Sequence, residues 1–174
     1  THMKNLTDDT ITVNPRLTVR MFREEGKSSG LLGFLRPVRQ KVEGQCMLDG
    51  DLERKDLKKI IKKGGFDRMG MVNWLSVDDL YFMAALIPQM DRLDAQAPSE
   101  EGHPVRCVVD TDGRGGIRGT LDFGRFHVQP GETIELPART YLGPKEYDIL
   151  DEAGHDLGKV IDYGWFSRDR KSVV

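Results

Sequence analysis

The sequence predicts a mainly β protein, an antiparallel sandwich with an amphipathic helix close to its C-terminal end. Apolar and polar residues alternate along several short runs, and Gly, Asp and Pro residues separate these runs at regular intervals. Two other stretches show helical periodicity instead. Because successive side chains of a strand point to opposite faces, each alternating run presents one apolar face to a core.

The alternating runs are predicted strands, and they lie near both ends of the chain. The first two cover residues 10–13 and 17–21, and the others follow one another from residue 105 onward. The last run begins after Pro130-Gly131 and reaches Tyr141. The apolar positions of these runs are Ile11, Val13, Leu17, Val19, Met21, Val105, Cys107, Val109, Ile117, Leu121, Phe123, Phe126, Val128, Ile134 and Leu136.

One run differs from the others because it is apolar without interruption. It extends from Leu80 to Ile87 and stops at Pro88. Such a run is typical of a strand that is covered on both faces or of a short buried helix. Pro88 and the aromatic pair Tyr81-Phe82 favour the strand.

The first helical stretch covers residues 54–63, RKDLKKIIKK. Leu57, Ile60 and Ile61 fall on one side of a period of about 3.6 residues. The lysines of this stretch are predicted to form a solvated helix face. A site for phosphate or for lipid head groups is the alternative interpretation of the same lysines.

The second helical stretch covers about residues 144–161 and is the predicted C-terminal helix. Pro144 stands where a helix tolerates a missing N–H, and Glu146 in the first turn and Lys159 near the end match the helix dipole. Two glycines in the stretch weaken a helix by about 1 kcal/mol each relative to Ala, so packing has to hold it. One stripe of this helix carries Tyr147, Leu150, Leu157 and Ile161.

Length and composition predict one globular domain over residues 4–167. The chain has 174 residues, of which 38% are hydrophobic and 31% are charged, which is typical of a folded water-soluble protein. The net charge of −2 gives no reason to expect nucleic-acid binding. No run of about eighteen apolar residues is present, so no segment is predicted to span a membrane. Residues 1–3 resemble a tag remnant, and residues 168–174 resemble a vector tail or a cut end.

The two cysteines, Cys46 and Cys107, form no CxxC pair and have no histidine at zinc-like spacing. Two small buried thiols are the favoured interpretation. A disulfide is the alternative if the compartment is oxidising.

No catalytic, cofactor or metal site is predicted. Asp110-Thr111-Asp112-Gly113 resembles the start of a calcium loop, but the twelfth position is Leu121 rather than Glu, and a hairpin turn is the better interpretation. The glycines that follow lack a phosphate-binding motif. His103, His127 and His155 are scattered over three elements and are not predicted to form a metal site. The chain is therefore not predicted to be an enzyme.

Three aromatic residues, Tyr163, Trp165 and Phe166, follow the predicted C-terminal helix. They are suited to capping the core of the domain. They are equally suited to a membrane boundary, where Trp and Tyr are enriched. Composition alone leaves both interpretations open.

The stretch over residues 140–167, TYLGPKEYDILDEAGHDLGKVIDYGWFS, resembles the end of the large periplasmic domain in the YidC/Oxa family of membrane protein insertases. Two more pieces resemble the same family in the same order: Asn5-Leu6-Thr7-Asp8, and Val72-Asn73-Trp74 followed by residues 81–88. In that family further strands precede the first piece, so the present chain resembles an N-terminally truncated domain. The last part of the match is carried by Tyr141, Gly143, Pro144, Lys145, Tyr147, Leu150, Leu157, Ile161, Asp162, Gly164, Trp165 and Phe166.

The resemblance implies a β-supersandwich of the galactose-mutarotase type without catalytic activity or cofactor. It implies a scaffold and interaction module on the periplasmic side of the bacterial inner membrane. The whole protein would aid insertion, folding and assembly of membrane proteins, alone or with the Sec translocon. The implied partners are nascent membrane proteins and Sec components of the SecDF and SecYEG type. The candidates for a membrane-proximal or core-docking role are Tyr147, Leu150, Leu157, Ile161, Tyr163, Trp165 and Phe166.

A carbohydrate-binding or substrate-binding periplasmic sandwich is the alternative function, and it rests on the likeness of folds alone. Such a module needs exposed aromatic rings on a concave face. The candidate rings are Trp74, Tyr81 and Phe123, and burial in the core is the favoured interpretation of each. A groove that holds an extended substrate at a sheet edge is a third possibility.

Overall fold

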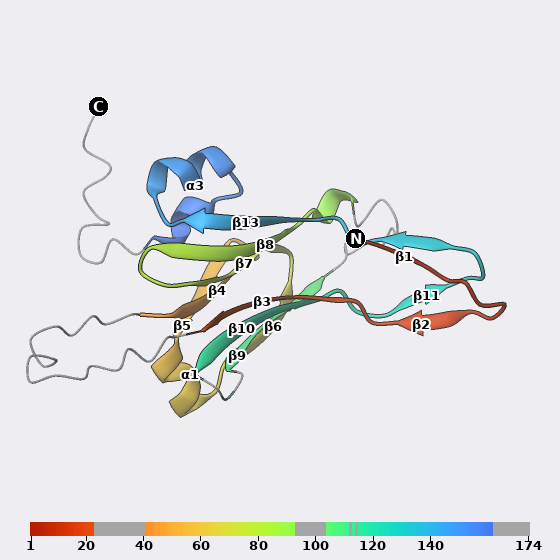
Figure 1. Cartoon of the computed structure of the whole chain (residues 1–174), viewed down its shortest axis with the longest axis horizontal. Coiled ribbons are helices and arrows are strands. Elements are labelled where there is room, and N and C mark those ends of the chain that lie inside the picture. Colours follow the sequence, from red (N-terminus) through yellow and green to blue (C-terminus); the bar gives the residue numbers. More distant parts are fainter. Residues whose placement is uncertain (23–40, 93–103, 112, 114, 162–174) are drawn as a thin grey trace, which may run out of the picture.

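The computed structural model describes residues 1–22, 41–92, 104–111, 113 and 115–161, and these residues form an antiparallel β-sandwich, as predicted (Figure 1). One sheet has five strands in the order β13-β8-β7-β4-β5, and the other has four in the order β3-β10-β9-β6. The five strands are β13 (Ala138–Pro144), β8 (Phe82–Pro88), β7 (Val72–Asp78), β4 (Glu43–Leu48) and β5 (Asp51–Asp56). The four strands are β3 (Arg16–Phe22), β10 (Gly116–Asp122), β9 (Val105–Thr111) and β6 (Phe66–Gly70).

Two small two-stranded sheets extend the molecule on the right of Figure 1. They pair β1 (His2–Lys4) with β12 (Thr133–Glu135), and β2 (Ile11–Val13) with β11 (Phe126–Val128). Residues 1–3, which were expected to lie outside the domain, take part in the fold: His2 and Met3 pair with Glu135 and Ile134 in an antiparallel ladder.

The predicted strands over residues 10–13, 17–21, 105–109, 117–123 and 126–128 are confirmed within a residue or two. The turn after β9 joins it to β10 as the predicted hairpin. The single strand predicted after Pro130-Gly131 is wrong, because the chain breaks there into β12 and β13. These two strands pair with different partners, β1 and β8, on either side of Pro137.

A disulfide between Cys46 and Cys107 joins the two sheets through the core. The favoured prediction of two free thiols is therefore wrong. Cys46 lies on β4 and Cys107 on β9, both side chains are fully buried, and the two Cα atoms are 6.8 Å apart. The sequence does not reveal that these strands face each other, because they belong to different sheets and lie far apart in the chain.

The apolar run that stops at Pro88 is a strand, β8, and its two faces serve two cores. Ala84 and Leu86 face the core between the sheets. Met83, Ala85 and Ile87 face a second core on the outer side of the five-stranded sheet. A strand buried on both faces shows no alternation, and this explains the run from Met83 to Ile87. Leu80 and Tyr81 precede the strand, and these two side chains and Phe82 are exposed, so the prediction of burial on both faces is wrong for them.

The first predicted helix is shorter than residues 54–63, because residues 54–56 belong to β5 and α1 covers Leu57–Lys63. The side chain of Asp56 accepts a hydrogen bond from the backbone N of Lys59 at 2.9 Å and caps the helix. Leu57 and Ile60 are buried as predicted. Ile61 is not, since 62% of its surface is exposed.

The predicted single helix over residues 144–161 consists of two short pieces, α3 (Tyr147–Ala153) and the 3₁₀-helix η2 (Leu157–Val160). Three consecutive residues with positive φ separate them: Gly154 at 73°, His155 at 57° and Asp156 at 61°. This left-handed backbone ends an α-helix. Pro144 does not begin a helix, since it is the last residue of β13. Both pieces lie over the five-stranded sheet (Figure 1).

The second core lies beneath these two helical pieces. Leu150, Leu157 and Val160 are fully buried and belong to one apolar cluster with Trp74 and Met83 of the sheet. Apolar burial of this kind contributes about 1.5–3 kcal/mol for each large side chain. Tertiary packing thus holds a segment whose glycines disfavour a continuous helix.

Candidate functional site

The candidate site lies at one end of the five-stranded sheet, where the described chain ends at Ile161. Three connections leave the sheet at this end: the one from β13 to α3, the turn from β7 to β8, and the one from β5 to α1 (Figure 1). The strand registers place these three connections side by side. The row of paired residues just inside this end is Asp56, Glu43, Asp78, Met83 and Gly143.

A buried ion pair between Lys145 and Asp78 is the centre of the site. The Lys145 ammonium donates to the Asp78 carboxylate and, at 3.3 Å, to the carbonyl oxygen of Asp79. The Lys145 backbone N donates to the carbonyl oxygen of Tyr81 at 2.6 Å. Asp78 is fully buried, and the Lys145 side chain is 11% exposed. The residue that follows β13 is therefore tied to the β7–β8 turn by its side chain and by its backbone.

Two further polar side chains extend this contact to the end of η2. Gln45 Nε2 donates to Asp78 Oδ1 at 2.8 Å, and Gln45 Oε1 accepts from Arg54 Nε at 3.0 Å. Arg54 Nη2 then donates to the carbonyl oxygen of Val160 at 3.0 Å. These bonds satisfy a carbonyl that the short helix leaves unpaired. We call Gln45, Arg54, Asp78 and Lys145 the junction network.

Burial has the largest effect on the pKa of Asp78, the carboxylate of the junction network. It raises the pKa of Asp78 to about 6, against the opposing charge and hydrogen bond of Lys145 and the hydrogen bond of Gln45. The nearby Glu43 carboxylate raises the pKa of Asp78 further. At neutral pH Asp78 is ionised and pairs with the Lys145 ammonium.

The motif Tyr141-Leu142-Gly143-Pro144-Lys145 shapes the strand end that carries Lys145. Tyr141 Oη donates to the carbonyl oxygen of Pro144 at 2.7 Å. A Cβ at position 143 would lie 2.9 Å from Tyr141 Oη and 3.0 Å from its Cζ. Any larger residue would require the ring to shift from this position. The motif thus has a structural explanation in this chain.

The predicted membrane-proximal or core-docking residues have different positions in the structure. Leu150 and Leu157 are fully buried against the domain's own sheet. Tyr147 is 37% exposed and lines, with the half-buried Ile161, a cavity of about 500 Å³. Tyr163, Trp165 and Phe166 lie outside the described residues.

The sequence pointed to Lys145 but not to its partners. Asp78 and Gln45 interrupt apolar strands without any local motif. The sequence predicts Arg54 in a helix, whereas the structure has it in β5. Only the unusual placement of a carboxylate directly after Trp74-Leu75-Ser76-Val77 would have signalled a buried pair. The partner of that carboxylate lies 67 positions away in the sequence.

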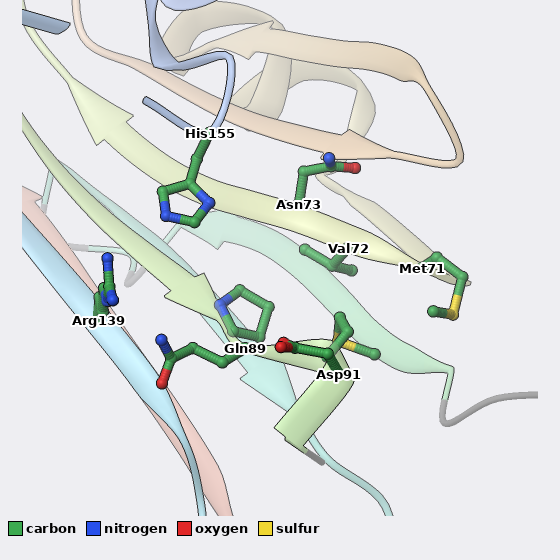
Figure 2. A pocket seen from close by; sticks show the side chains of 9 residues that line it. Met71, Val72, Asn73, Gln89, Asp91, Arg139 and His155 are labelled. Atoms are coloured by element: carbon green, nitrogen blue, oxygen red, sulfur yellow. The ribbon is translucent and has the colours of Figure 1, made fainter. Parts of the chain in front are cut away.

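A second cavity, of about 480 Å³, lies where the break between α3 and η2 approaches β7 and β13. Figure 2 shows His155 and Arg139 on one side of it and Asn73 on the other. No Trp, Tyr or Phe is among the described residues that line it. The rings proposed for sugar stacking lie elsewhere: Trp74 and Phe123 are buried as predicted, whereas Tyr81, predicted to be buried, is 68% exposed.

Within the part of the chain that the structure describes, no helix is both long and apolar enough to cross a membrane. The same residues include no group of three or more His, Cys, Asp or Glu side chains arranged to hold a metal ion.

Comparisons with known proteins identify the family. The sequence family model described as the YidC periplasmic domain matches residues 1–168. The chain is 28% identical over 127 residues to the membrane protein insertase YidC of Pelobacter propionicus, covering 72% of this chain and 21% of that protein. It is 28% identical over 136 residues to the membrane protein insertase YidC of Geotalea daltonii, and this match covers 78% of this chain and 24% of that protein. The chain is 27% identical over 160 residues to the membrane protein insertase YidC of Syntrophobacter fumaroxidans, and the match covers 89% of this chain and 27% of that protein.

These relatives are far longer than the present chain, which spans about a fifth to a quarter of their length. The resemblance that the C-terminal motif indicated is confirmed, and the family model matches residues 1–168 rather than that motif alone. Because the family model covers almost every residue, the chain belongs to the YidC periplasmic domain family.

Proposed function

We propose that the chain is the periplasmic module of a longer inner-membrane insertase, and that it acts as a non-catalytic scaffold and interaction domain. The whole protein would aid the insertion, folding and assembly of membrane proteins, alone or with the Sec translocon. The family match and the names of the relatives support this role. The inter-sheet disulfide supports a periplasmic location, because disulfides persist in oxidising compartments.

The junction network is the observation that carries the scaffold role. It binds the carbonyl of Val160 through Arg54 and the start of the C-terminal segment through Lys145. Loss of one partner from a buried ion pair costs about 3–5 kcal/mol. A domain with this network holds the end of η2 at Val160 in a fixed orientation relative to the sandwich, as a scaffold for the segments that follow requires.

The proposed partners are nascent membrane proteins and Sec components of the SecDF and SecYEG type. These partners rest on the family resemblance. The net charge of −2 provides no electrostatic basis for a nucleic-acid partner.

The alternative function, carbohydrate binding, has less support. Trp74 and Phe123 lie in the cores, and the cavity of Figure 2 presents polar side chains without a stacking ring among its described residues. A glycan array probed with the chain tests this alternative, and saturable binding to a defined sugar would favour it over the scaffold role.

The scaffold role is tested in cells that depend on the full-length protein. Lys145→Gln and Arg54→Gln variants are expected to lower the yield of an inserted reporter membrane protein at equal expression. Lys159→Gln is the matched control, because the ion pair of Lys159 with Asp156 is exposed. Undiminished insertion in both network variants would contradict the role. Co-purification of Sec components, measured with and without this domain, tests the partners.

A further inference from the structure

Three consecutive apolar side chains project from the β7–β8 turn. Leu80, Tyr81 and Phe82 are 55%, 68% and 58% exposed, and we call them the apolar tip. Single exposed apolar residues are common on protein surfaces, but contiguous ones mark an interaction site. Leu142, which is 74% exposed, lies on the neighbouring strand near Phe82 and extends the apolar surface.

The backbone of the apolar tip is held firmly although its side chains are exposed. Asp79 Oδ1 accepts hydrogen bonds from the backbone N of Tyr81 at 2.7 Å and of Phe82 at 2.8 Å. The Asp79 backbone N donates to the carbonyl oxygen of Phe82 at 2.9 Å. Lys145, the residue after β13, donates hydrogen bonds to the carbonyl oxygens of Tyr81 and Asp79. The side chains are thus presented to solvent on a pre-organised turn.

The same end of the sheet carries lysines on α1 that make no ion pair with the part of the chain that the structure describes. Lys58, Lys62 and Lys63 have no ion-pair partner among the described residues, and the exposed Ile61 lies between them. By contrast, Arg16, Arg106 and Arg118 on the outer face of the four-stranded sheet each pair with an aspartate.

The strand order places α1 and the apolar tip at the same end of the five-stranded sheet. Asp56, the last residue of β5 and the N-cap of α1, is in one row with Glu43 and Asp78, so α1 and the turn leave the sheet at the same level. Two strand spacings, or about 10 Å, separate β5 from β7. The nearest carboxylates are engaged: Asp56 caps α1, and Asp79 binds the turn.

We propose that this end of the sandwich is a membrane-contacting surface, with the apolar tip in the interfacial layer of a bilayer and the α1 lysines against its anionic head groups. This deepens the proposed function and rests on it for the presence of a membrane next to the domain. Leu, Tyr and Phe on a projecting turn suit the boundary between head groups and acyl chains. The α1 lysines at the same end of the sheet complement anionic lipid. The end of η2 at Val160, held by Arg54, lies at the same end of the sheet.

Vesicle binding by the 174-residue chain tests the surface. The chain is expected to sediment with vesicles of phosphatidylcholine and phosphatidylglycerol and to bind pure phosphatidylcholine more weakly. Tyr81→Ser/Phe82→Ser should lower the partition coefficient by about tenfold or more, since two large apolar groups lose their burial. Leu6→Ser/Met69→Ser is the matched control, with exposed fractions of 85% and 64%, and should bind as the parent does.

The charge contribution is tested separately. Lys58→Gln, Lys62→Gln and Lys63→Gln should each weaken binding to the anionic vesicles by about fivefold. The control variants Lys4→Gln and Arg125→Gln remove exposed charges elsewhere and should have no such effect. Equal losses in both sets would show non-specific adsorption and would overturn the proposal.

Insertion depth separates insertion of the tip from adsorption through the lysines. With Trp165→Phe as background, Phe82→Trp fluorescence should be quenched by brominated lipid, and Met69→Trp fluorescence should not. The buried Trp74 is a constant signal in both. Unquenched Trp at position 82 would overturn the proposal. Failure here leaves the insertase role intact, because that role is measured by reporter insertion in cells rather than by vesicles.

Discussion

The disulfide between Cys46 and Cys107 offers a direct test of how the sandwich is held together. It closes a loop of 61 positions and joins β4 to β9 across the core. A cross-link of that span removes about 14 cal/mol/K of chain entropy from the unfolded state. At room temperature the free energy of unfolding should therefore fall by about 4 kcal/mol when the bond is reduced. For a domain of this size the melting temperature should fall by about 8–16 °C.

Urea unfolding of the oxidised and the reduced chain measures this difference. The double variant Cys46→Ala/Cys107→Ala is the control for the reductant, which should leave its unfolding midpoint unchanged. The variant should be less stable than the reduced parent, because Ala leaves part of each thiol's volume empty. Equal midpoints for the oxidised and reduced parent, or two free thiols titrated in the denatured oxidised chain, would refute the reasoning.

Three other predictions concern the junction network, the Tyr141–Lys145 motif and the second core. Folding raises the pKa of Asp78 from 3.8 to about 6, so the folded state binds this proton more tightly than the unfolded state does. The resulting contribution to the free energy of unfolding is complete below about pH 4. It falls by about 3 kcal/mol as the pH rises through 6. Unfolding measured from pH 3.5 to 7 should show this decline in the parent and lose it in Asp78→Asn; an unchanged profile in the variant would contradict the assignment. Gly143→Ala should destabilise by about 1–3 kcal/mol because its Cβ meets the Tyr141 ring, and Gly143→Ala/Tyr141→Leu should recover most of the loss in thermal unfolding. Leu157→Ala should cost about 2–5 kcal/mol, whereas Ile149→Ala, at a side chain 40% exposed, should cost less than about 1 kcal/mol; equal losses would mean that the outer core does not hold η2.

The strands with one polar face were predictable from the sequence, and the strands buried on both faces were not. β3 and β10 alternate clearly, whereas every residue of β4 is buried and the strand mixes Glu43 and Gln45 with apolar side chains. A strand of that kind has no two-residue period to detect. The hairpin after β9 was predictable because its glycines act locally.

The junction network was only partly predictable, because its members lie on four strands or strand ends. The motif that ends in Lys145 indicated a family and a position, but the register that brings Asp78 to it depends on the pairing of β13 with β8 and of β8 with β7. Similarly, the break between α3 and η2 follows from three consecutive residues with positive φ. Gly154 adopts that backbone readily, and His155 and Asp156 are residue types that are enriched there, but no local motif signals three such residues in a row.

The hydrogen bond from Arg54 Nη2 to the carbonyl oxygen of Val160 has a mechanical consequence. Tension on the chain beyond Ile161 would act first on η2, whose few residues are held by this side chain and by the apolar contacts of Leu157 and Val160. Short terminal pieces open at a lower free energy than the core strands. Under load η2 should peel away from the sheet before either sheet of the sandwich yields, so that the domain keeps its shape while its tether lengthens by a few residues.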